Sequence, residues 1–218
     1  MAEAVLPMTL PTLRLHDVAC RRGGRWLFKA LGFELAPGEL LWLRGRNGSG
    51  KSSLLRLVTG LARPDAGSLR WGDEDVRDSA RFRRDLSYLA HVNALKAPLD
   101  AMASLAFLAR CHGRGASVAA LTAALDRLGL AGHRDAPIGR LSEGQRRRVA
   151  LARLALDERP GLWVLDEPFD ALDADGCERL AALLHEHRAR GGSVLLTSHA
   201  AQPLEALAPR ALDLEAFA

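Results

Sequence analysis

A glycine-rich segment of the chain has the residue types and spacing needed to bind phosphate. Residues 45–52, GRNGSGKS, follow the pattern G-x-x-x-x-G-K-[ST]. Glycines let the backbone curl until successive N–H groups face phosphate oxygens, and a following helix N-terminus adds favourable dipole charge. We expect Lys51 to reach the β- and γ-phosphates of a nucleotide and Ser52 to contact Mg²⁺. The candidate nucleotide-binding residues of this segment are Gly45, Arg46, Asn47, Gly48, Ser49, Gly50, Lys51, Ser52 and Ser53.

The sequence on either side of this loop supports the phosphate-binding interpretation. Residues 39–45, ELLWLRG, are typical of a strand, and apolar residues recur at helical spacing after Gly50. A strand, a glycine-rich loop and a helix in this order form the setting that phosphate binding requires. The alternative, a surface turn with a solvated lysine, requires neither flanking element.

Two carboxylates follow an apolar strand later in the chain. Residues 162–167 read LWVLDE, and parallel sheets gather ligands at the carboxyl ends of their strands. Asp166 is expected to hold Mg²⁺, usually through water. Glu167 is then placed to polarise the water that attacks the γ-phosphate, because phosphoryl transfer depends on positioning more than on covalent chemistry. In the alternative, both carboxylates only cap the strand in solvent.

A third motif precedes a helical segment, RRRVALARLAL. It consists of Leu141, Ser142, Glu143, Gly144 and Gln145. Ser142 and Gln145 form an S-x-x-Q capping box. A pure helix cap is the alternative to phosphate binding here, although exposed N–H groups at a helix start allow both roles.

The elements around these motifs predict a parallel α/β sheet with an inserted helical lobe. Strands are expected at 12–18, 26–35, 39–45, 68–72, 85–92, 161–166 and 192–198, and helical segments after Gly50, within 99–130 and at 174–190. The continuous apolar strands of the last third suit a sheet that is buried on both faces. We expect one domain over 1–218, with a core of about 12–92 and 158–218 and a helical subdomain of about 93–157.

The composition is that of an ordinary globular protein. The 218 residues fit one large domain, and the net charge of +4 only weakly favours anionic partners. The three cysteines form no C-x-x-C pair, which disfavours a disulfide framework or a zinc site. The start of the chain, with Glu3 and two prolines, does not predict a signal peptide. No apolar run reaches the roughly twenty residues of a membrane-spanning helix, so a membrane role needs a separate spanning protein.

The order of the motifs resembles the ATP-binding cassette family over nearly the whole chain. The motifs are GRNGSGKS, LSEGQ, LWVLDEP, ALD at 171–173, and His199 after the strand GSVLLTS. The resemblance implies a P-loop NTPase fold of the cassette type, with a mixed or parallel sheet core, a small antiparallel β subdomain and an inserted α-helical subdomain. It also implies ATP and Mg²⁺ as ligands and an ATPase coupled to transport by integral membrane subunits.

The same resemblance implies a head-to-tail homodimer with ATP at its interface. The LSEGQ signature of one subunit would close over the ATP held by the other, and Asp173 would help to link the two sites. His199 would hydrogen-bond the γ-phosphate and orient the attacking water; the alternative is a surface histidine.

Three positions depart from the family pattern. Glu143 stands where the commonest signature has glycine, and Arg22 stands where many cassettes have an aromatic residue that stacks on adenine. A guanidinium can also stack on the base, so Arg22 remains a candidate nucleotide contact. Val92, followed by Asn93, is expected at the position where the family usually has a glutamine that touches Mg²⁺.

A narrower resemblance is to the haem exporter ATPases of bacterial cytochrome c maturation. It is carried by YLAHVNALKAPLDAMASLAF, LSEGQRRRVALARL and LWVLDEPFDALD. It implies a peripheral homodimer at the cytoplasmic face of the inner membrane, with membrane subunits and haem-handling maturation proteins as partners. ATP would drive either release of a haem-loaded chaperone or export of haem. Without C-x-x-C-H the chain itself should not carry covalent haem, and Cys111-His112 is expected to be an ordinary pair.

Other classes of cassette protein are the alternatives. The chain could serve a different small-molecule transporter. A nucleic-acid-associated cassette protein would carry long inserts, zinc modules or a second cassette, none of which the sequence has, so we expect no nucleic-acid partner. A regulatory module without hydrolysis is disfavoured by the presence of both Glu167 and His199, while Val92 leaves some room for it.

Overall fold

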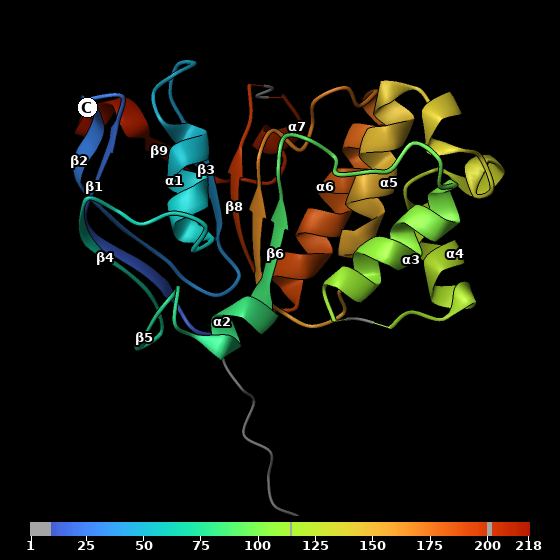
Figure 1. Cartoon of the computed structure of the whole chain (residues 1–218), viewed down its shortest axis with the longest axis horizontal. Coiled ribbons are helices and arrows are strands. Elements are labelled where there is room, and N and C mark those ends of the chain that lie inside the picture. Colours follow the sequence, from blue (N-terminus) through green and yellow to red (C-terminus); the bar gives the residue numbers. More distant parts are fainter. Residues whose placement is uncertain (1–9, 114, 200–201) are drawn as a thin grey trace, which may run out of the picture.

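A parallel sheet forms the centre of the molecule, with an antiparallel sheet on one side and a lobe of helices on the other (Figure 1). The computed structural model describes residues 10–113, 115–199 and 202–218. The parallel strands lie in the order β6-β7-β8-β3-β9. Their bounds are β3 Leu40–Arg44, β6 Leu86–Leu89, β7 Leu162–Leu165, β8 Ser193–Thr197 and β9 Arg210–Asp213. Every neighbouring pair runs parallel, so the carboxyl ends of all five strands meet at one edge.

The central strands of this sheet are buried on both faces. Every residue of β7 and β8 is buried. Trp163 and Leu165 face one hydrophobic cluster, while Leu162 and Val164 face another. Alternate side chains of a strand point to opposite faces, so an entirely apolar strand fits a sheet that is covered on both sides.

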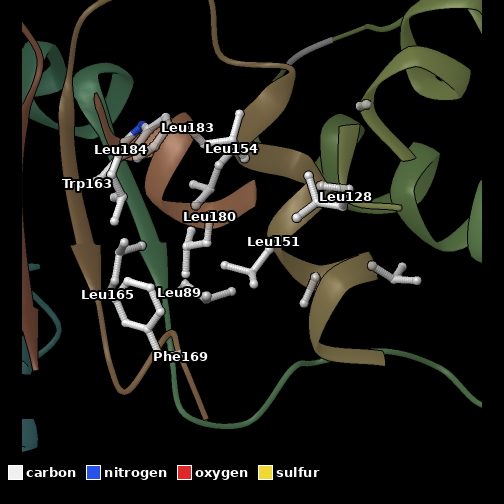
Figure 2. Packing of buried hydrophobic residues seen from close by; sticks show 14 of the residues in the cluster. Leu89, Leu128, Leu151, Leu154, Trp163, Leu165, Phe169, Leu180, Leu183 and Leu184 are labelled. Atoms are coloured by element: carbon white, nitrogen blue, oxygen red, sulfur yellow. The ribbon is translucent and has the colours of Figure 1, made fainter. Parts of the chain in front are cut away.

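The first hydrophobic cluster joins the helical lobe to the sheet. Figure 2 shows Leu180 lying between the strand residues Trp163 and Leu165 on one side and Leu151 of the lobe on the other, and all four belong to this cluster. The lobe therefore packs on the sheet and on the neighbouring helix through one continuous set of apolar contacts.

Three α-helices of the described chain form the lobe, and the remaining described helices lie outside it. The lobe helices are α3 Ala101–Cys111, α4 Val118–Arg127 and α5 Glu143–Ala155, with short 3-10 helices at Ala131–His133 and Ile138–Arg140. The others are α1 Lys51–Val58, α2 Ala80–Asp85, α6 Ala174–Ala189, α7 Gln202–Glu205 and a 3-10 helix at Leu214–Phe217. Within the described ranges, no helix has both the length and the apolar content that crossing a bilayer demands.

The antiparallel sheet covers α1. Its order is β2-β1-β4-β5, and its bounds are β1 Leu13–Arg22, β2 Arg25–Leu35, β4 Ala66–Trp71 and β5 Glu74–Asp75. Gly23 and Gly24 join β1 to β2 with φ of 55° and 78°, the two positive values that a two-residue hairpin turn needs. The apolar face of α1 is fully buried in the second cluster, together with Phe28 and Trp71.

The fold confirms the predicted class, but several local elements differ from the sequence prediction, among them α2, β6 and β9. Helix α2 was not predicted: its sequence, ARFRRD, buries only Phe82 and is too short to show a helical period. Strand β9 was also missed, because it is an edge strand whose residues are mostly exposed and whose partner β3 lies far back in the chain. Strand β6 ends at Leu89, earlier than the predicted 92.

Candidate functional site

The glycine-rich loop joins β3 to α1, as the sequence predicted. Gly45, Gly48 and Gly50 have φ of 140°, 82° and 105°, in the region that residues with a side chain rarely adopt. A Cβ on Gly45 would lie 2.7 Å from Oγ of Ser49, and one on Gly50 would lie 3.1 Å from Cβ of Leu27. The shape of the loop therefore requires glycine at these positions.

Helix α1 begins without a side-chain cap. Its N-cap is Gly50, so the first N–H groups of the helix are left to a ligand or to solvent. The Nζ of Lys51 curls back over the loop and donates to the carbonyl oxygens of Gly45 at 2.7 Å and Arg46 at 3.2 Å. Backbone N–H donors and the Lys51 ammonium group thus lie together at the start of α1, which is the arrangement that binds phosphate.

A cavity of about 610 Å³ lies beside this loop, at the carboxyl edge of the parallel sheet. Loop residues and both predicted carboxylates contribute to its wall. The lining residues are Arg22, Leu27, Asn47, Gly48, Gly50, Lys51, Ser52, Ser53, His91, Asp166, Glu167, Asp170 and His199. The fold therefore brings Lys51 and Ser52 together with Asp166, Glu167 and His199, which are distant in sequence.

Three of the candidate loop residues, all within the described part of the chain, do not line the cavity. These are Gly45, Arg46 and Ser49. Gly45 and Arg46 supply the carbonyl oxygens that hold Lys51. The Arg46 side chain turns away, and its Nε lies 3.1 Å from Oε1 of Glu215 in the C-terminal segment.

Thr197 anchors the two carboxylate residues. Its Oγ1 donates to Oδ1 of Asp166 at 2.9 Å and accepts from the backbone N–H of Glu167 at 2.9 Å. Asp166 is further held by its N–H, which donates to the carbonyl of Leu89 at 2.8 Å. The Asp166 carboxylate and the Ser52 hydroxyl are oxygen ligands of the kind that Mg²⁺ prefers, and both line the cavity, so these residues fit the ion.

Glu167 has the features of a proton acceptor. It is 7% exposed, and burial raises the pKa of its carboxyl group, while His199 opposes this shift. The backbone N–H of His199 donates to Oε2 of Glu167 at 3.0 Å, and Nε2 of the His199 ring lies 3.6 Å from Oε1 of Glu167. Oε1 is buried and has no hydrogen-bond partner in the described part of the chain. Because Glu167 lines the cavity, that oxygen is placed to accept from a water molecule there.

His91 and Asp170 also line the cavity, although the sequence did not single them out. The Nδ1 of His91 lies 3.9 Å from Oδ2 of Asp170. The sequence placed Val92 at the corresponding position, but Val92 is 75% exposed and is not part of the lining, so His91 is the residue that reaches the cavity. Polar residues that follow adjacent parallel strands were the signal that could have found this pair.

Arg22 lines the end of the cavity formed by the antiparallel sheet, beside Leu27. Trp26 is 41% exposed and lies outside the lining. Its ring centroid is 5.2 Å from Nζ of Lys29 and 5.6 Å from Cζ of Arg21. A guanidinium rather than an aromatic ring is therefore the group available to stack on a base.

The signature residues lie outside the cavity of their own chain. In the described residues, none of Leu141–Gln145 contributes to its lining. Ser142 and Gln145 form the predicted capping box. A Cβ on Gly144 would lie 2.5 Å from the Ala171 carbonyl oxygen, so this glycine allows the signature to approach the segment before Asp173. The Asp173 carboxylate in turn lies 3.5 Å from Nη2 of Arg148 on α5.

The site agrees with the comparison of the chain with known families. The sequence profile of the ABC transporter family matches residues 28–170, more than half of the chain. The chain belongs to the ABC transporter family. It is an ATP-hydrolysing transport subunit of that family, as the order of its motifs predicted.

Curated relatives within the family match nearly end to end. The "Cytochrome c biogenesis ATP-binding export protein CcmA" of Aromatoleum aromaticum is 46% identical over 209 residues, covering 95% of this chain and 97% of its own. The protein of the same name from Haemophilus influenzae is 42% identical over 206 residues, covering 94% and 96%.

Solved structures of the same family share the fold. A Pyrococcus furiosus protein described as an ABC transporter ATP-binding protein has a TM-score of 0.81 at 19% identity, covering 95% of this chain and 99% of its own. An ATP-binding cassette in a dimeric post-hydrolysis state, bound to ADP and Pi, has a TM-score of 0.75 at 24% identity, covering 88% and 89%.

Proposed function

We propose that this ATPase powers haem handling in the biogenesis of c-type cytochromes. The names of relatives that match nearly the whole chain support the pathway. One structural observation supports the chemistry: a single cavity contains the phosphate-binding loop, the Asp166 and Glu167 carboxylates and His199.

The site residues predicted from the sequence that line the cavity then have the following roles. The loop amides and Lys51 bind the β- and γ-phosphates, and Arg22 stacks on the base. Ser52 and Asp166 would hold Mg²⁺, which neutralises phosphate charge when bound. Glu167 accepts a proton from the attacking water, and His199 hydrogen-bonds the γ-phosphate and orients that water.

The proposal includes a head-to-tail homodimer. The signature, Leu141–Gln145, does not line the nucleotide cavity of the same chain. The N-terminus of α1 has no side-chain cap at Gly50, so the signature of a second copy can cover the nucleotide there. Ser142, Glu143 and Gly144 would face the nucleotide of the partner, and Asp173 would link the two sites. The dimeric state of a solved cassette supports this arrangement.

The proposed location is the cytoplasmic face of the bacterial inner membrane, on integral membrane subunits. Haem-handling maturation proteins are the proposed further partners. The energy of ATP would either release a haem-loaded chaperone or export haem.

The Glu167→Gln variant tests the chemistry. The amide keeps the shape of the side chain but is a far weaker proton acceptor, so hydrolysis should fall by about a hundredfold or more. ATP binding should survive, because Lys51, Ser52, the loop amides and Asp166 are unchanged. With Mg-ATP, size-exclusion chromatography should show the variant shifting from monomer to dimer. A monomer at saturating ATP, or near-normal hydrolysis, would remove Glu167 from this role.

Deletion of the gene in a bacterium that makes c-type cytochromes tests the pathway. Covalent haem staining of those cytochromes should disappear and should return with the intact chain but not with Glu167→Gln. Normal staining after deletion, together with intact ATPase activity, would assign the chain to another small-molecule transporter.

A further inference from the structure

We propose that Arg147 is a positioning residue that fixes the backbone of Glu167 and ties it to the signature helix. This proposal rests on the role of Glu167 proposed above. Arg147 lies on α5, two residues after the signature, and is 3% exposed. It is one of three consecutive arginines, and none of the roles assigned above involves it.

One nitrogen of the Arg147 guanidinium holds both peptide groups of Glu167. Nη2 donates to the carbonyl oxygen of Asp166 at 2.9 Å and to that of Glu167 at 2.7 Å. These carbonyls belong to the peptide units immediately before and after the Cα of Glu167. Their orientations define the backbone conformation of Glu167, and therefore the direction in which its carboxylate leaves the chain.

The other terminal nitrogen holds the segment that carries His91. Nη1 donates to Oδ1 of Asn93 at 2.8 Å, with longer contacts to the carbonyl oxygens of Ala90 at 3.3 Å and His91 at 3.4 Å. One buried cation therefore connects the signature helix, the loop after β7 and the loop after β6.

Glu167 needs such a restraint because its backbone is strained. Its φ is +48°, a region that residues with a side chain rarely occupy. Strained residues of this kind persist only where several contacts determine them. Thr197 fixes the N–H of Glu167, and Arg147 fixes the two carbonyls. Without Arg147 the two peptide units are free to relax, and the carboxylate would leave its position beside His199.

An arginine is required at this position rather than any cation. A guanidinium is a planar fork that donates from two terminal nitrogens in fixed directions, whereas an ammonium is a single point with three donors. Lysine would keep the charge but could not bond the loop after β7 and the loop after β6 simultaneously. A shift of α5 would also move the peptide groups of Glu167, so the position of the helical lobe is transmitted to the catalytic carboxylate.

The experiment compares Arg147→Lys and Arg147→Gln with Arg127→Gln in the full chain, co-purified with its membrane subunits. Arg127 is a matched control, because its Nη2 joins α4 of the lobe to Glu186 of α6 at 2.5 Å without touching the cavity. For both Arg147 variants, kcat should fall on the order of a hundredfold, the usual scale for loss of alignment. The Kd for ATP and the KM should change by less than about threefold. The control should keep the kcat of the unchanged chain.

Residual hydrolysis by a variant with both Glu167→Gln and Arg147→Lys shows whether Arg147 positions Glu167 or only supports the fold in general. In the Glu167→Gln background, Arg147→Lys should cause no further loss, because the group that it positions is already gone. Arg147→Lys keeps a cation in place and should unfold at nearly the temperature of the unchanged chain.

The proposal is overturned by an additive loss in the double variant, or by Arg147→Lys and Arg147→Gln hydrolysing ATP as fast as Arg127→Gln. In either case, low activity of Glu167→Gln alone would leave the proposed role of Glu167 intact. Normal hydrolysis by Glu167→Gln would instead refute that role, and the positioning proposal with it.

Discussion

Helices α1 and α5 each begin at one of the predicted phosphate-binding motifs, but their first N–H groups are satisfied differently. Helix α1 starts after Gly50, which has no side chain to cap it. Helix α5 starts after Ser142, whose Oγ accepts from the N–H of Gln145 at 3.1 Å, while Oε1 of Gln145 accepts from the N–H of Ser142 at 2.9 Å. The first helix start leaves its donors open to a ligand, whereas the second uses its cap for its own stability.

The two helix starts also differ in the charge beside them and in whether they face the cavity. Lys51 brings a cation to the start of α1, in the same cavity as the carboxylates of Asp166 and Glu167. The start of α5 carries an anion, Glu143, and lies outside that cavity. One half of the site is therefore complete within the chain, and the other is a preformed surface that gains its function in the proposed dimer.

The largest expected effect is on nucleotide binding by the half that is complete within the chain. Lys51→Ala should abolish binding, because it removes the cation at the β- and γ-phosphates. Lys96→Ala is the matched control: its Nζ lies 4.5 Å from the Phe107 ring centroid, away from the cavity lining, and binding should stay intact. Titration with a fluorescent ATP analogue measures both, and equal losses would contradict the assignment of the loop.

A bulky cation at the other helix start should stop turnover but spare binding. Ser142→Arg places a long side chain where the signature would meet the nucleotide of the partner. Its own phosphate-binding loop is unchanged, so equilibrium binding of ATP should match that of the unchanged chain. Steady-state phosphate release measures turnover. Normal hydrolysis by this variant would rule out the dimer model.

Acid should lower the free energy of unfolding of the whole domain, and with it the stability of both helix starts, through a histidine that lies at neither of them. His187 is fully buried and stacks on Trp163, with ring centroids 3.8 Å apart, and its Nε2 lies 3.0 Å from the Gly161 carbonyl oxygen. Burial lowers the pKa of His187 from 6.5 to about 4. Between these values only the unfolded chain is protonated, so the stabilisation is complete above about pH 6.5 and is lost as the pH falls towards about 4.

The loss from this one group should reach roughly 3 kcal/mol in the free energy of unfolding. Urea unfolding at about pH 7 and about pH 5 should show about 2 kcal/mol of this loss, because that interval covers only part of the range between the two pKa values. His187→Phe keeps an aromatic ring on Trp163 and should lose less stability over the same interval. An identical loss in the variant would exclude His187 as its source.

The smallest expected effect is on the cap itself. Ser142→Ala should lower the free energy of unfolding by about 1 kcal/mol. Ser117→Ala on α4 is the matched control, because Ser117 Oγ accepts from the N–H of Ala120 at 3.2 Å in the same way. Both should cost similar stability in denaturant unfolding, but only Ser142→Ala should slow hydrolysis. Equal turnover in the two variants would make the signature serine a cap and nothing more.

The sequence by itself determined the elements that have a strong local pattern. The apolar runs before Asp166 and before His199 predicted buried strands, and the glycine spacing at 45–50 predicted a loop between a strand and a helix. The capping box at Ser142 was also readable, because its two partners are three residues apart and depend on no distant contact.

Only the tertiary structure decided which residues meet across those elements. His91 rather than Val92 lines the cavity. Strand β6 ends at Leu89, so the alternation of side chains along a strand does not predict which of the following residues points to the cavity. Of the three consecutive arginines in the first half of α5, Arg147 is the buried one. Its helical spacing to Leu151 and Leu154 was a signal, but the carbonyl oxygens that it holds come from loops after two different strands. Local patterns fix elements, whereas the partners of a buried polar group are set by how those elements pack.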